Sequence, residues 1–60
     1  MELKINGENA IKGKEYKDFR GDTHILLDWR LPHKPSSTGR VITDKGEFFP
    51  GVINGQFVDE

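Results

Sequence analysis

The sequence predicts a single small all-β domain, a five-stranded barrel that carries one long proline-containing loop. Two observations lead to this prediction. Short β-forming stretches alternate with turn signals such as Asn-Gly and Asp-Lys-Gly along the chain. The chain has 60 residues, which is enough for one domain only. A barrel removes exposed strand edges, and a chain this short has no other elements with which to cover them.

The first strand is predicted at residues 1–5, where apolar and charged side chains alternate and an Asn-Gly turn signal follows. This alternation places Leu3 and Ile5 in the core. Residues 8–19 fit a strand, a loop or a short helix, because some of their apolar residues also have helical spacing. Gly13 would cost such a helix about 1 kcal/mol relative to alanine, so a strand or loop is favoured.

The second clear strand is predicted at residues 23–29, after a turn at residues 20–22. Its residues alternate with a period of two, which indicates one face inward and one face outward. The inward face is expected to hold Ile25, Leu27 and Trp29. The outward face is expected to be polar, with His24 and Asp28 in solvent.

Residues 39–58 are predicted to form a three-stranded antiparallel meander. Asp-Lys-Gly at residues 44–46 indicates the first hairpin turn, because the glycine suits a left-handed backbone. Asn-Gly at residues 54–55 lies between β-forming residues, which is the pattern of a two-residue hairpin. Pro-Gly at residues 50–51 interrupts the middle strand and predicts a bulge or a sharp bend there.

Two stretches resemble known families. The pattern Gly39-Arg40-Val41-Ile42 followed by Gly46 resembles the strand-turn-strand unit of Src-homology-3-like barrels, including the Tudor type. This resemblance implies a small five-stranded barrel. The stretch "LDWRLPHKPSSTGRV" followed by "EFFP" resembles short, uncharacterised phage-encoded proteins. That resemblance implies no known activity, and it favours a small accessory or host-interacting protein.

Composition narrows the function classes. The chain has no cysteine and only two histidines, so it offers no disulfide and too few ligands for a structural zinc site. We therefore expect no metal and no cofactor. The N-terminal residues include charged side chains and no apolar run, so we expect no membrane segment and a cytoplasmic protein. A net charge of -1 argues against strong nonspecific binding to nucleic acid.

The most distinctive stretch is residues 28–41, "DWRLPHKPSSTGRV". Two prolines restrict its backbone to extended geometry, so the loop loses little entropy on binding. Aromatic and arginine side chains, the usual composition of interaction hot spots, lie within it or beside it. The candidate partner-binding residues are Trp29, Arg30, His33, Lys34, Arg40, Phe48 and Phe49. Two alternatives to this interpretation stay open. The loop could serve only as a connection between strands, and Trp29 could be a core residue instead of a binding residue.

Phe48 and Phe49 are adjacent in a predicted strand, so their side chains point to opposite faces. One ring is therefore expected to be exposed or covered by the long loop. An exposed ring would supply an apolar contact for a partner.

These features predict a noncatalytic interaction module that binds a protein partner. The alternative is a weak nucleic-acid-binding barrel, in which the same cations contact phosphate and an aromatic ring stacks on a base. An enzyme is not expected. His24 lies near Asp22 and Asp28 in the sequence, but a polar outer strand face explains that pattern more simply. We therefore expect no catalytic residues.

Overall fold

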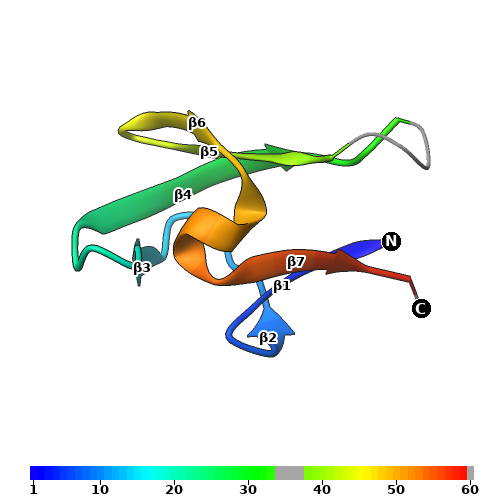
Figure 1. The fold of residues 1–60 in the computed structure, drawn as a ribbon, viewed down its shortest axis with the longest axis horizontal. Coiled ribbons are helices and arrows are strands. Elements are labelled where there is room, and N and C mark those ends of the chain that lie inside the picture. The colour runs from blue at the N-terminus through cyan, green and yellow to red at the C-terminus, as the bar shows by residue number, and fades with distance from the viewer. Residues whose placement is uncertain (34–37, 60) are drawn as a thin grey trace.

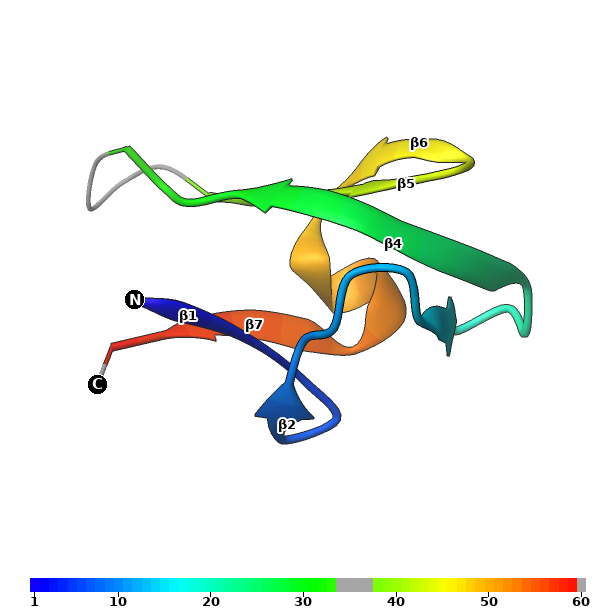
Figure 2. The same cartoon turned by 180° about the vertical axis from the view of Figure 1, so that it is seen from behind.

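The structure, a computed structural model, describes residues 1–33 and 38–59. Within these residues the chain forms seven strands and one short 3-10 helix. In chain order they are β1 (Glu2–Ile5), β2 (Glu8–Asn9), β3 (Glu15–Lys17), β4 (Thr23–Arg30), β5 (Arg40–Thr43), β6 (Gly46–Phe48), η1 (Pro50–Ile53) and β7 (Gly55–Val58). The strands pair antiparallel in two sheets, with the orders β2-β1-β7 and β3-β4-β5-β6. Figures 1 and 2 show the two sheets facing each other, with η1 leading from one to the other.

The all-β prediction is confirmed, but the closed five-stranded barrel is not found. The described residues form seven strands instead of five, and no strand pairing joins one sheet to the other. The extra strands β2 and β3 are only two and three residues long. They lie in the segment of residues 8–19 for which strand or loop was favoured, and no helix forms there among the described residues.

The N-terminal prediction is confirmed. Leu3 and Ile5 are buried, and the turn that follows β1 uses positive φ angles of 54° at Asn6 and 79° at Gly7. Asparagine and glycine tolerate this left-handed backbone with little strain, so the dipeptide allows β1 to return as β2.

The strand predicted at residues 23–29 is confirmed, but the prediction of which side chains point into the core was wrong. His24 and Leu26 are buried, whereas Ile25 and Leu27 are exposed. The register with β5 shifts between Leu26 and Asp28, which is the mark of a β-bulge. An extra residue on one strand reverses the alternation beyond it, so Trp29 still packs against the core.

The C-terminal prediction is confirmed for its first hairpin and wrong for its second. β5 and β6 pair around the turn at residues 44–46, with φ of 124° at Gly46. The middle strand ends at Phe48, because Pro50 begins the 3-10 helix η1, and the third predicted strand forms as β7 without pairing with β6. Proline suits a first helical turn, where its missing N–H is not needed. Asn54, at φ 58°, ends that helix, and β7 then pairs with β1 instead of β6.

A small core lies between the two sheets. Its buried apolar side chains are Leu3, Ile5, Tyr16, Leu26, Val41 and Ile53. Partly buried side chains pack around them: Ala10, Trp29, Phe48, Val52 and Phe57. A domain this small buries only about 60% of its unfolded surface, so each core contact carries a large share of the stability. Among the described residues, no helix is both long and apolar enough to cross a membrane.

Candidate functional site

A groove of about 320 Å³ opens between the ends of the long loop, η1 and β7. Its walls come from segments that are far apart in the sequence. They are Pro32, Thr38, Gly39, Phe49, Pro50, Gly51, Gly55, Gln56 and Phe57. We call this feature the Phe49 groove, after its most exposed aromatic residue.

Phe49 forms the outer rim of the groove and has 55% of its surface exposed. The guanidinium carbon of Arg40 lies 4.1 Å from the centre of the Phe49 ring. A guanidinium stacked in this way is held in place by the ring, while the N–H groups at its edge stay free to donate. The rim therefore joins an apolar surface to an oriented cation.

A second arginine lies directly across the sheet. Arg30 of β4 and Arg40 of β5 are cross-strand partners. Within the described residues neither forms an ion pair, and Asp28, two residues before Arg30, pairs with Lys12 at 3.2 Å. Like charges placed opposite each other across strands are destabilising. The pair thus creates a local positive charge on a chain whose net charge is -1.

Gly39 closes the inner wall of the groove and admits no larger residue. A Cβ placed on it would lie 2.3 Å from a ring carbon of Phe57 and 2.5 Å from the carbonyl oxygen of Arg30. The backbone of the loop therefore packs directly on the Phe57 ring. This contact fixes the point from which β5 and Arg40 begin.

The structure brings together three of the predicted partner-binding residues, Arg30, Arg40 and Phe49. It confirms that the two adjacent phenylalanines differ in exposure, because Phe48 packs against the core and Phe49 is exposed. Trp29 also packs against the core, with the Lys12 ammonium 5.3 Å from its ring. Trp29 and Phe48 therefore belong to the core, and among the cavities of the described residues each lines a different one from the Phe49 groove.

The remaining two predicted residues belong to the long loop. His33 is exposed, at the last described position before the tip of the loop. Lys34 lies outside the described residues, as do Pro35, Ser36 and Ser37.

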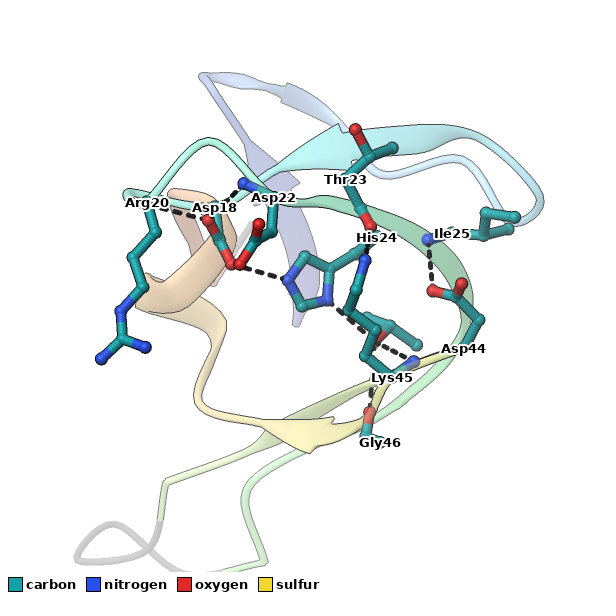
Figure 3. A network of polar contacts seen from close by, with 10 residues as sticks. Asp18, Arg20, Asp22, Thr23, His24, Ile25, Asp44, Lys45 and Gly46 are labelled. Carbon is teal, nitrogen blue, oxygen red and sulfur yellow. Dashed lines mark hydrogen bonds and ion pairs between the residues drawn. The ribbon is translucent and has the colours of Figure 1, made fainter.

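The sequence reasoning missed a buried polar network centred on His24 (Figure 3). Asp18 Oδ2 lies 2.9 Å from His24 Nε2, and His24 Nδ1 lies 3.0 Å from Thr43 Oγ1. With Asp18 ionised, the Nε2–H donates to its carboxylate. Thr43 Oγ1 also accepts from the Lys45 N–H and lies within donating distance of the Gly46 carbonyl oxygen, so its single hydroxyl proton is shared between that oxygen and His24 Nδ1. The network joins the turn after β3 to the hairpin of β5 and β6.

Asp18 is held in its ionised form by this network. The hydrogen bond from His24 is the main cause that lowers the pKa of Asp18 below its ordinary value of 3.8. Backbone N–H groups of Asp22 and Arg20 also donate to Asp18 and act in the same direction. The run Asp18–Asp22 contains the usual signal for such a turn, an aspartate whose carboxylate caps following N–H groups.

A second cavity of about 320 Å³ adjoins this network. It is lined by Asp18, Phe19, Arg20, Asp22, His24, Lys45, Phe48 and Val52. Both ring nitrogens of His24 are already engaged, and Phe48 packs edge-on against the imidazole with ring centres 5.0 Å apart. Among the described residues, no group of three or more His, Cys, Asp or Glu side chains could hold a metal ion. His24 thus links β4 to Asp18 and Thr43 through contacts within the protein.

Comparisons with protein-family models, with curated proteins and with solved structures find no match for this chain.

Proposed function

We propose that this protein is a noncatalytic interaction module that binds a partner protein at the Phe49 groove. The observation that carries the proposal is the stacked pair of Arg40 and Phe49 at the rim, with Arg30 beside it. A partner segment that places a carboxylate next to an apolar side chain matches this arrangement. The carboxylate pairs with the arginines, and the apolar side chain enters the groove against Phe49.

Two physical arguments support a protein partner. Aromatic and arginine residues dominate binding hot spots, and the most effective ones lie beside a pocket that excludes water. The groove is also preorganised, because Gly39 and Phe57 fix its inner wall and the ring of Phe49 holds Arg40 in place. Less conformational entropy is lost when such a surface binds.

We infer further that the chain is related in architecture to Src-homology-3-like barrels. Three features support this inference. The long strand β4 is followed by β5 and β6 in a meander, a 3-10 helix precedes the last strand, and that last strand pairs with the first. Small domains of this architecture carry their binding residues in the loops, as proposed here for the ends of the long loop.

Nucleic acid is the second candidate ligand. Arg30 and Arg40 can contact phosphate, and the exposed ring of Phe49 can stack on a base. Affinity for nucleic acid falls steeply with salt, because bound phosphates release counterions. Affinity that depends on an apolar anchor changes much less. Binding measured from low to high salt therefore distinguishes the two ligands.

A pull-down from lysate of the native host, with and without nuclease, tests the proposal. We expect a protein partner that survives nuclease treatment and is lost with Arg30→Ala plus Arg40→Ala. The loss in affinity should be at least about tenfold, or roughly 1.4 kcal/mol, because two preorganised cations disappear.

The matched control is Lys17→Ala plus Arg20→Ala, which removes the same charge from β3 and the turn after it. This variant should retain the partner. A partner that binds the Arg30 and Arg40 variant as tightly as the unmodified protein would contradict the proposal. A partner that disappears on nuclease treatment would favour nucleic acid.

A further inference from the structure

The strand β7 is the least protected edge of the two sheets. The described strands leave four edges, at β2, β7, β3 and β6. Three of these edge strands, β2, β3 and β6, carry charged residues, namely Glu8, Glu15, Lys17 and Glu47. β7 reads Gly-Gln-Phe-Val and carries neither a charge nor a proline. Charges and prolines on an edge prevent pairing with another chain, so β7 is the edge that remains open to it.

The register of β7 with β1 shows which of its backbone groups face outward. Asn6 N donates to Asn54 O over 3.0 Å, directly beside the ladder in which Lys4 pairs with Gln56. Hydrogen-bonded and non-hydrogen-bonded pairs alternate in an antiparallel ladder. Gln56 therefore exchanges hydrogen bonds with Lys4, and the N–H and C=O groups of Gly55 and Phe57 point away from β1.

The residues that carry these outward groups line the Phe49 groove. Gly55 and Phe57 both line it, and the opposite wall is formed by the loop residues Pro32 and Gly39. β7 lies in front of β1 in Figure 1 and behind it in Figure 2. The side of β7 that faces away from β1 is therefore not covered by its own sheet. Outward groups two residues apart repeat every ~7 Å, which is the spacing of the matching groups in an extended peptide.

We propose that the groove binds an extended segment of its partner protein as an added strand on β7. The segment pairs with the N–H and C=O groups of Gly55 and Phe57. A carboxylate on the segment reaches Arg40 at the rim, which supplies the charge complementarity. This inference rests on the proposed function and specifies its ligand as an extended peptide that adds backbone hydrogen bonds to the carboxylate and apolar contacts already proposed.

The test uses the full chain and a phage-displayed library of random linear peptides. A selected peptide is synthesised, and hydrogen exchange of the backbone amides is followed by NMR with and without it. In the free protein the amide of Gln56, which faces β1, should be protected, and those of Gly55 and Phe57 should exchange quickly. Saturating peptide should slow exchange at Gly55 and Phe57 about tenfold or more and leave Gln56 little changed.

N-methylated peptides provide the second arm of the test. Methylation removes one N–H donor from the peptide without changing its side chains. Methylation at alternate peptide positions should abolish binding, and methylation at the positions between them should be tolerated, because an added strand pairs through every second residue.

Three outcomes would overturn the inference. A peptide that needs Arg30 and Arg40 but leaves exchange at Gly55 and Phe57 unchanged would exclude strand addition and leave the proposed function intact. A library that yields no peptide dependent on the two arginines would contradict both proposals. Self-association that protects Gly55 and Phe57 without any peptide would make a second copy of this chain the occupant.

Discussion

Replacing Gly39 with alanine is expected to destabilise the protein by about 3 kcal/mol, the upper end of the usual range for an overpacked site. The new Cβ would overlap a ring carbon of Phe57 and the carbonyl oxygen of Arg30. The Phe57 ring packs against the core, so moving it costs packing, and the carbonyl oxygen belongs to the paired backbone of β4. A domain this small would lose roughly 15 °C or more in Tm, as measured by circular dichroism during heating.

Gly51→Ala is the matched control for this experiment. A Cβ at Gly51 would have no neighbour within 4 Å among the described residues, and Gly51 lies in η1 without a positive φ. Its Tm should stay the same or rise slightly, because alanine has less backbone entropy to lose. Equal stabilities for the two variants would mean that the loop does not pack on Phe57 as described.

Replacing His24 with leucine is expected to lower the free energy of unfolding by about 3 kcal/mol. The side chain of His24 is only 2% exposed and bonds both Asp18 and Thr43. Leucine fills a similar volume but leaves the Asp18 carboxylate and the Thr43 hydroxyl without this partner. Loss of the hydrogen bond to the partly buried Asp18 carboxylate and loss of the buried contact with Thr43 together account for that cost. Urea unfolding at neutral pH measures it, and His33→Leu, at an exposed position, should leave the stability unchanged.

The effect of His24→Leu should also depend on pH. Because the folded-state pKa of Asp18 is lowered, its contribution to stability is complete above 3.8 and is lost as the pH falls through the lowered value. The difference in the free energy of unfolding between the variant and the unmodified protein should therefore shrink in strong acid. A difference that is absent at neutral pH would contradict the structural role given to His24.

Local patterns predicted the elements that depend on neighbouring residues. The alternation in β1 and the glycine turn between β5 and β6 are local, and both were correct. The prediction of which β4 side chains point inward was wrong, because a bulge between Leu26 and Asp28 reverses the inward–outward alternation along the strand. His24 is buried because Asp18 and Thr43 satisfy its nitrogens, and no period-two pattern records such partners.

The C-terminal segment shows how one local signal can serve two structures. Asn54 adopts a positive φ as predicted, but it ends a helix instead of turning a hairpin. Tertiary pairing of β7 with β1 decides between these outcomes. The same pairing explains the candidate site: Arg30, Arg40 and Phe49 were predicted from their types, whereas the walls formed by Pro50 and Phe57 depend on where β7 lies.

The most direct measurement compares the affinity of the recovered partner for Phe49→Ala and Phe19→Ala. Both phenylalanines are exposed, and each has an arginine over its ring. The guanidinium carbon lies 4.1 Å from the ring centre for Arg40 on Phe49 and 5.4 Å for Arg20 on Phe19. Of these two phenylalanines, Phe49 alone lines the groove. Titration calorimetry should show Phe49→Ala weakening binding about 30-fold, the loss of roughly 2 kcal/mol typical of a hot spot. Phe19→Ala should stay within about twofold of the unmodified protein. Equal losses for both variants, or no loss for Phe49→Ala, would contradict the assignment of the Phe49 groove as the binding site.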